Sequence, residues 1–111
     1  VNLNLSVSGG ALPKEFALSQ NYPNPFNPST KFEVSLPQAA HLDVSVYNLL
    51  GQRVATLANE TRDAGYYTVV WNGTTQIGAQ AASGIYFVRM NARPAGTAQG
   101  FNTVRKIMLM K

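Results

Sequence analysis

The chain has 111 residues, a length typical of one domain with a single core. It contains no cysteine, which excludes disulfides, thiolate nucleophiles and cysteine-ligated zinc or iron–sulfur sites. Hydrophobic residues make up 45% of the chain and charged residues 13%, a composition typical of a globular protein rather than a coiled coil or a disordered tail. No apolar run approaches the roughly 20 residues that a membrane helix needs.

The formal net charge is +4, and it is unevenly distributed. Residues 1–63 carry four basic and five acidic side chains, whereas residues 64–111 carry five basic and no acidic ones. Such an asymmetry could mark an anionic partner, such as nucleic acid, lipopolysaccharide or an acidic protein surface. The basic residues are, however, spread over two predicted strands and the end of the chain. This spread favours ordinary solvated side chains and predicts no nucleic-acid partner.

Residues 1–12 are small and polar, and Ser8, Gly9 and Gly10 favour flexibility. The composition predicts a linker from a preceding module over residues 1–12 and a domain over residues 13–111. Nothing near Val1 has the order of basic, apolar and small residues that a signal peptide shows. We therefore expect the chain to be a piece of a longer precursor.

A proline-rich segment follows, in which Pro23, Pro25 and Pro28 occur within NYPNPFNPST. Each proline fixes its own φ and pushes the preceding residue toward extended geometry. Asparagine side chains can bond to nearby backbone in such a segment. The pattern predicts a stiff, ordered loop.

From residue 30 onward, apolar residues recur with a period of two, which is typical of half-buried strands. Turn signals separate the predicted strands, and no segment has a useful helical period. About seven short strands in about 100 residues predict an all-β fold, an antiparallel immunoglobulin-like β-sandwich. The clearest strands are expected at residues 30–36, 42–47, 54–57, 66–71, 84–92 and 101–110.

Two features of this predicted sandwich concern its core. Without a cysteine pair, Trp71 is expected to anchor the core by packing alone. The last strand ends in Ile107-Met108-Leu109-Met110 and is apolar on both faces. We expect it inside a sheet, because as an exposed edge it would invite aggregation.

Catalytic chemistry has few candidate residues. His41 is the only histidine, so a catalytic triad and a three-histidine metal site are excluded, and a solvated strand residue is the simpler interpretation. Glu60 and Asp63 lie close together beside Arg62, which favours a solvated turn over an acid/base pair. We expect no enzyme activity, no cofactor and no metal site.

The aromatic side chains allow an alternative in which the domain binds carbohydrate. Exposed rings can stack on a ligand, as they do in single-strand nucleic-acid sites. Alternation, however, places Tyr67 and Trp71 with the core residues and leaves only Tyr66 and Tyr22 free.

Five segments in this order resemble the C-terminal sorting domain, type A, of the type IX secretion system. The resemblance covers residues 13–111, nearly the whole chain. The segments are LSQNYPNPFNPST at 18–30, VYNLLGQRVATL at 46–57, AGYYTVVWNG at 64–73, ASGIYFVRM at 82–90 and VRKIMLMK at 104–111.

The resemblance implies a function that the periodicity does not reveal. Such domains are immunoglobulin-like sandwiches at the C-terminus of exported cargo, often a glycoside hydrolase, protease or adhesin. An outer-membrane translocon and a shuttle protein read the folded domain. A gingipain-like sortase then commonly cleaves ahead of it, near Ala11 and Leu12 here. The expected location is the cell surface or the medium of a Gram-negative bacterium, after transit through the periplasm.

The resemblance also implies recognition residues, each of which has a purely structural alternative. Gly84 and Tyr86 could equally serve the fold, as a backbone turn and a core ring. A preformed proline loop loses little entropy on binding, which favours recognition. The lysines could steer the domain to an acidic receptor or simply solvate a strand end. The recognition residues expected from the family motifs are Pro23, Asn24, Pro25, Gly84, Ile85, Tyr86, Lys106 and Lys111.

A second family overlaps in pattern, namely the immunoglobulin-like domain of flagellar-hook capping proteins. It shares the VYN, LGQ, W-x-G and SGxY segments but lacks the combination of a proline-rich entry and a lysine-ended last strand. Two further functions stay open, a carbohydrate-binding module and a structural accessory domain of a secreted enzyme. An exposed last strand would also allow a dimer to form by edge pairing.

Overall fold

The computed structural model of the chain describes residues 3–5, 12–96 and 100–110. These residues form strands and turns, and none of them lies in a helix that could cross a membrane. In chain order the strands are β1 (Leu3–Leu5), β2 (Ala17–Leu18), β3 (Thr30–Leu36), β4 (Ala40–Tyr47), β5 (Arg53–Arg62), β6 (Gly65–Trp71), β7 (Gly84–Pro94) and β8 (Phe101–Leu109).

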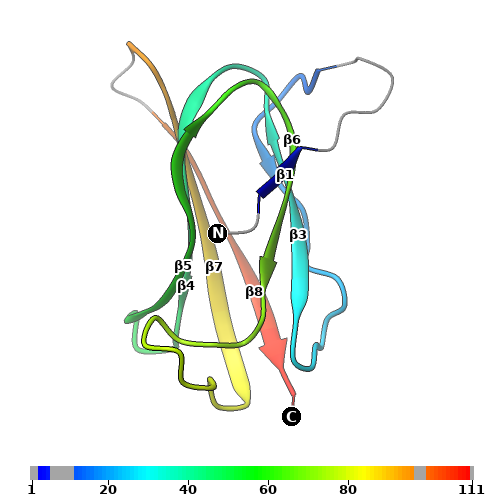
Figure 1. The fold of residues 1–111 in the computed structure, drawn as a ribbon, viewed down its shortest axis with the longest axis vertical. Coiled ribbons are helices and arrows are strands. Elements are labelled where there is room, and N and C mark those ends of the chain that lie inside the picture. Colours follow the sequence, from blue (N-terminus) through cyan, green and yellow to red (C-terminus); the bar gives the residue numbers. More distant parts are fainter. Residues whose placement is uncertain (1–2, 6–11, 97–99, 111) are drawn as a thin grey trace.

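The strands form two facing sheets of four strands each (Figure 1). The strand order is β1-β6-β3-β2 in one sheet and β5-β4-β7-β8 in the other. Every neighbouring pair is antiparallel. This architecture confirms the predicted immunoglobulin-like β-sandwich. It also contains two very short strands, β1 and β2, that the apolar period did not predict.

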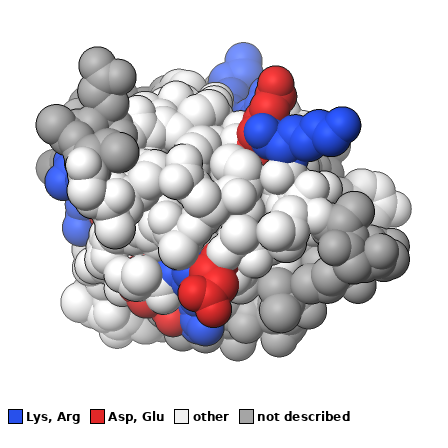
Figure 2. Space-filling view, turned by 90° about the horizontal axis from the view of Figure 1, so that it is seen from above, with Lys and Arg blue, Asp and Glu red and all other residues white. Residues whose placement is uncertain are grey.

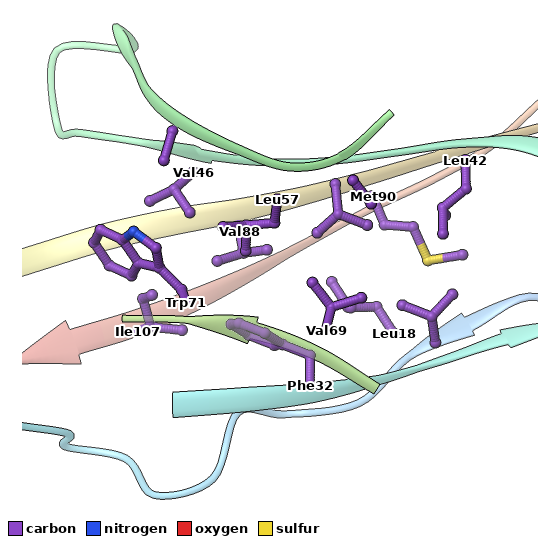
Figure 3. Packing of buried hydrophobic residues seen from close by; sticks show 14 of the residues in the cluster. Leu18, Phe32, Leu42, Val46, Leu57, Val69, Trp71, Val88, Met90 and Ile107 are labelled. Atoms are coloured by element: carbon purple, nitrogen blue, oxygen red, sulfur yellow. The ribbon is translucent and has the colours of Figure 1, made fainter. Parts of the chain in front are cut away.

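The core lies between the sheets and is filled by alternate residues of each strand (Figure 3). In β3, for example, Phe32, Val34 and Leu36 are buried while Lys31 and Glu33 are exposed. Burying a large apolar side chain contributes ~1.5–3 kcal/mol, so these rows of side chains hold the two sheets together.

Trp71 is 1% exposed and occupies one end of this core. Its ring centroid lies 5.5 Å from that of Phe26 and 5.3 Å from that of Tyr86, and its indole NH donates to the Thr74 carbonyl over 2.9 Å. The predicted anchoring role of Trp71 is confirmed. Tyr67 is also buried, as predicted, whereas Tyr22 is exposed.

The position of the last strand differs from the prediction. β8 is the edge strand of its sheet rather than an inner strand, and it pairs only with β7 among the named strands. Ile107 and Leu109 point into the core, whereas Val104 and Met108 are 54% and 39% exposed on the outer side. An apolar pattern on both faces predicts burial of both, but here the outer apolar side chains remain in contact with solvent.

The N-terminal segment also departs from the expected linker. Residues Leu3–Leu5 pair with β6, with Leu3 opposite Val69. The sheet therefore extends into the predicted linker. Ser8, Gly9, Gly10 and the expected cleavage residue Ala11 lie outside the described residues, while Leu12 is exposed.

Candidate functional site at the proline-rich loop and the last strand

The proline-rich loop, defined here as residues 19–29, is held in shape by a buried polar group at its base. Asn21 is 4% exposed, and its side-chain amide donates to the Pro23 carbonyl and to the Thr30 hydroxyl, each over 3.1 Å. The Thr30 hydroxyl in turn donates to the same carbonyl over 2.8 Å. Buried polar groups need such partners, so this network fixes the loop as the sequence predicts.

The loop also covers the free edge of β8. The Phe26 amide donates to the Met108 carbonyl, and the Met110 amide donates to the Phe26 carbonyl, both over 3.0 Å. The side-chain oxygen of Asn24 accepts from the Met108 amide over 3.2 Å. An unpaired strand edge is a template for aggregation, and these bonds satisfy it locally.

Two further contacts extend this cover along β8. The Gln20 side-chain amide donates to the Lys106 carbonyl over 3.1 Å. The Arg105 guanidinium Nε donates to the Leu18 carbonyl, at the end of β2, over 2.9 Å. The loop is thus bonded to the last strand at several successive positions.

A single buried side chain anchors the loop to the core. Phe26 is 1% exposed and packs against Trp71, while Pro23, Asn24 and Pro25 just before it are exposed. The peptide bonds before Pro23, Pro25 and Pro28 are cis. Because the buried Phe26 ring anchors it, the loop displays its proline motif on a fixed support, as a preorganised binding element would.

Several residues expected from the family motifs come together where the loop meets β7 and β8. A pocket of about 140 Å³ is lined by Asn24, Pro25, Ile85, Lys106, Ile107 and Met108. Four of these were expected from the sequence, and they come from three separate segments of the chain. Pro23 lies in the same loop, and Lys111 lies outside the described residues.

The structure gives Gly84 and Tyr86 structural roles. Gly84 has a φ of +150°, which side-chain-bearing residues rarely adopt, although a Cβ there would meet nothing within 4 Å. Tyr86 is 8% exposed, and its hydroxyl donates to the Ala82 carbonyl over 2.6 Å. Burial raises the pKa of the Tyr86 hydroxyl above its usual value. Neither residue is among those that line the exposed pocket.

Met108 lines the pocket but was not expected there from the sequence. Its side chain points outward because β8 is an edge strand, and sequence alternation assigned it to a second buried face. The sequence signal that could have placed Met108 on the outer face is Lys106, which lies two residues away and therefore on the same face of the strand. Lys106 is exposed and forms no ion pair with the described residues.

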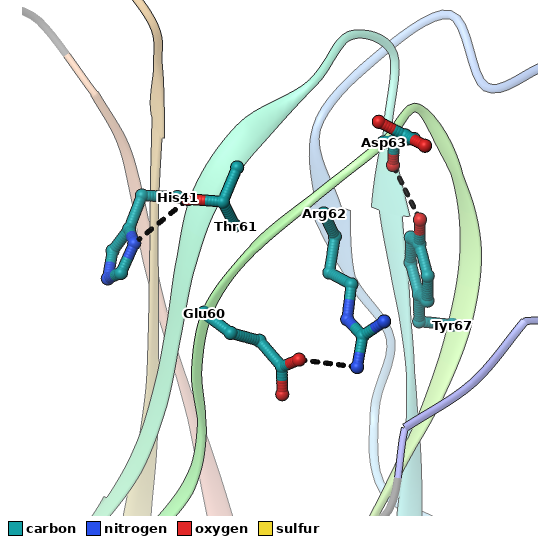
Figure 4. Close-up of polar contacts among 6 residues, drawn as sticks. All are labelled: His41, Glu60, Thr61, Arg62, Asp63 and Tyr67. Atoms are coloured by element: carbon teal, nitrogen blue, oxygen red, sulfur yellow. Dashed lines mark hydrogen bonds and ion pairs between the residues drawn. The ribbon is translucent and has the colours of Figure 1, made fainter.

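The residues considered for catalysis lie elsewhere and are engaged with neighbours (Figure 4). His41 is exposed on β4, where its ring nitrogens contact Asn59 over 2.7 Å and Thr61 over 3.4 Å. Glu60 lies in β5, rather than in a loop, and forms an ion pair with Arg62.

Asp63 follows β5 and acts through its backbone. Its carbonyl accepts the Tyr67 hydroxyl over 2.6 Å. The pKa of Tyr67 is raised, mainly by burial and next by the nearby Asp63 carboxylate.

At the end of the sandwich seen in Figure 2, basic and acidic groups are sparse and lie beside one another. In the part of the chain that the structure describes, no three metal-ligating side chains gather.

Comparison with known proteins places this geometry in a family. The model of the FlgD Ig-like domain matches residues 21–96, which is more than half of the chain. No curated protein matches the sequence significantly. The sequence relation to flagellar-hook capping domains, predicted as the lesser resemblance, is thus the one that a family model supports.

Two solved structures from Porphyromonas gingivalis share the fold. Dimeric latent PorU matches with a TM-score of 0.68 and 18% identity, over 93% of this chain and 10% of the PorU chain. PorZ, described as an essential bacterial surface component of the type-IX secretion system, matches with a TM-score of 0.53 and 17% identity, over 86% of this chain and 11% of PorZ. The chain therefore spans about a tenth of each, and at these identities the likeness concerns the fold.

Proposed function

The chain belongs to the FlgD Ig-like domain family, and we propose that it serves as a non-catalytic C-terminal sorting signal for type IX secretion. In this role it directs a larger cargo protein, such as a glycoside hydrolase, protease or adhesin, across the outer membrane. Its partners are the cargo domain ahead of it, an outer-membrane translocon, a shuttle protein and a gingipain-like sortase. The cargo ends at the cell surface or in the medium of a Gram-negative bacterium.

The observation that carries this proposal is the surface shared by the proline-rich loop and β8. These two segments are the ones that set the sorting-domain resemblance apart from the flagellar relative. In the structure they are bonded to each other and line one pocket with Asn24, Pro25 and Lys106. A receptor that contacts this pocket reads both segments at once.

The physical properties of this surface suit recognition. The proline motif is exposed, while Phe26 and Asn21 fix it from below, so little conformational entropy is lost when a partner binds. The exposed ammonium of Lys106 lies at the same pocket and offers a contact for an acidic group. The likeness to a domain-sized part of PorZ is consistent with a type IX role.

The test is export of a fluorescent reporter fused ahead of residues 1–111 in a host with type IX secretion. The fusion with the natural sequence is expected to reach the medium or the cell surface. The Lys106→Glu variant reverses one exposed charge at the pocket and is expected to accumulate in the periplasm. The Lys14→Glu variant, which reverses an exposed charge away from the pocket, is the matched control and is expected to be exported.

Both variants are purified and melted to show that they fold as the natural domain does. Retention of the natural fusion in the periplasm would overturn the sorting role. Equal export of Lys106→Glu and the natural sequence would overturn the assignment of recognition to this pocket. A second variant, Pro25→Ala, probes the loop side of the same pocket and is expected to reduce export as well.

A further inference from the structure

The outer face of the β5-β4-β7-β8 sheet carries a group of arginine side chains that the sorting role does not use. In the antiparallel register, Tyr47 lies opposite both Arg53 on β5 and Phe87 on β7. Further along β4, Ser45 lies opposite Arg89, and His41 lies opposite Arg93. Since opposite residues share a face, three arginines from two strands project from the same side of this sheet.

These side chains line an open pocket whose lining residues all carry polar or charged groups. Its walls are formed by His41, Asp43, Tyr47, Arg53, Arg89, Asn91 and Arg93. Asp43 is the single carboxylate in this lining, and its Oδ1 accepts the Ser45 hydroxyl over 2.7 Å. None of the three arginines forms an ion pair within the described part of the chain. The pocket therefore has an excess of positive charge that the domain does not neutralise.

Aromatic surface adjoins the arginine pocket and shares residues with it. A second hollow on the same face is lined by Tyr47, Phe87, Arg89 and Val104, with the turn residues Asn48, Leu49 and Gly51. The Arg53 guanidinium lies 5.9 Å from the centre of the Tyr47 ring, which holds that ring in place by a cation–π contact. Charged and aromatic groups thus form one continuous strip.

The strip is long and its polar groups are ordered. From Tyr47 to His41 along β4 it extends roughly 20 Å, at 3.3–3.4 Å per residue. The Asn91 amide donates to the Asn102 side-chain oxygen over 2.6 Å, and the Arg89 guanidinium donates to the same oxygen over 3.3 Å. His41 projects from the outer side of the sheet beside Thr61 (Figure 4). These bonds leave further donors free for a ligand.

We propose that this strip is a binding site for an acidic polysaccharide, a chain of carboxylated or sulfated sugars. Guanidinium groups recognise carboxylate and sulfate oxygens in a bidentate manner. The Asn91 side chain suits hydroxyl groups, and the half-buried rings of Tyr47 and Phe87 offer apolar contact to a sugar ring.

The site is independent of the sorting role, since its test needs no translocon. Binding of polygalacturonate and of heparin to the purified chain is measured by titration calorimetry, with neutral dextran and a single-stranded oligonucleotide as competitors. We expect both acidic glycans to bind, with an affinity that falls as salt is added, and dextran to bind far more weakly.

The decisive variants remove two positive charges on or off the strip. Arg89→Ala combined with Arg93→Ala is expected to weaken binding at least about tenfold, because each lost arginine removes charge-assisted hydrogen bonds. Lys14→Ala combined with Lys31→Ala, which removes two exposed charges elsewhere, is expected to change the affinity less than about twofold. Phe87→Ala is expected to weaken binding without altering its salt dependence.

Three results would overturn the assignment. The first is no binding of the natural chain to either acidic glycan. The second is an equal loss of affinity in the arginine and lysine variants, which would indicate general charge attraction. The third is equal binding of the oligonucleotide, which would indicate a site for polyanions of any kind.

Discussion

The two edges of the β5-β4-β7-β8 sheet are protected in different ways. At the β5 edge, the pairing with β4 shifts register between Val44 and Ser45 and again between Val46 and Tyr47. Such bulges increase the local twist and break up a regular edge. At the β8 edge the pairing with β7 is regular over nine positions, and the proline-rich loop bonds to the free edge of β8.

This contrast shows that a strand edge can be protected by its own strand or by a distant segment. At the β5 edge the bulges lie within the strand pair itself, and the adjoining turn 48–52 is closed locally, since the Asn48 side chain accepts from the Leu50 and Gln52 amides. The β8 edge relies on a residue pair 84 positions apart, Asn24 and Met108. Disturbing the loop should therefore be costly at one edge and leave the other intact.

The largest effect is expected for Phe26→Ala, which removes the anchor of the loop. Losing this buried ring should destabilise the domain by ~3–5 kcal/mol. The comparison is Val54→Ala, which shortens a half-buried side chain on β5 and should destabilise the domain by about 1 kcal/mol. Denaturant unfolding measures both, and hydrogen exchange at the Met110 amide should accelerate only in Phe26→Ala. A loss below about 1 kcal/mol in Phe26→Ala would contradict the anchoring role.

The next effect compares two glycines with nearly the same backbone angle. Gly73 has φ +77° and Gly51 has φ +81°. A Cβ at Gly73 would lie 2.7 Å from the Pro28 carbonyl oxygen, whereas one at Gly51 meets nothing within 4 Å. Gly51→Ala should destabilise the domain by ~1–2 kcal/mol through φ alone. Gly73→Ala should add a further ~1–3 kcal/mol from the clash with the loop backbone. Equal losses in thermal melts would show that the loop yields freely.

A smaller effect is expected at the two tyrosines that bond to the carbonyl four residues before them. Tyr86→Phe and Tyr67→Phe should each destabilise the domain by about 1 kcal/mol. Both pKa values are raised in the folded state, mainly by burial, so the folded domain holds these protons more tightly than the unfolded chain. The contribution of the two protonated hydroxyls to the free energy of unfolding is therefore fully present below about pH 10, the ordinary pKa of tyrosine, and falls as the pH rises above it.

The measurement is the free energy of unfolding between pH 8 and pH 11. The natural domain should lose stability over the alkaline part of this range, and the double phenylalanine variant should lose less. An identical slope in both proteins would contradict the assignment of the alkaline loss to these hydroxyl groups.

The smallest effect is expected at the β5 edge itself. Glu60→Gln removes the ion pair with Arg62. The Glu60 side chain is 34% exposed and the Arg62 side chain 38% exposed. Exposed pairs contribute ~0.2–1 kcal/mol and are screened by salt. The difference in melting temperature between Glu60→Gln and the natural domain should therefore be small and should shrink at high salt. A large loss that persists in salt would show that this edge depends on the pair.

The sequence predicts those parts of the fold that local patterns determine. Alternation located β3, β6 and the core position of Trp71, because side chains on a strand alternate between faces whatever the strand pairs with. The prolines and asparagines predicted an ordered loop, and Asn21 fulfils that role.

The remainder depends on tertiary neighbours that no local pattern records. Whether Met108 faces solvent depends on β8 being an edge strand, and the same alternation is compatible with an inner strand. The partners of Phe26 and Asn24 lie more than eighty residues away, so periodicity could not pair them. The arginine strip depends on the register between β4 and β7, which strand prediction alone does not supply.

The contact between the loop and the last strand also has a consequence for the order of synthesis. A ribosome makes Asn24 and Phe26 long before Met108 and Met110, so the hydrogen bonds between the loop and the last strand form only once residues 108–110 have been added. Only then is the surface shared by the proline-rich loop and β8 complete. A chain interrupted before β8 lacks all of these bonds, so the joined surface marks molecules in which β8 has already been synthesised.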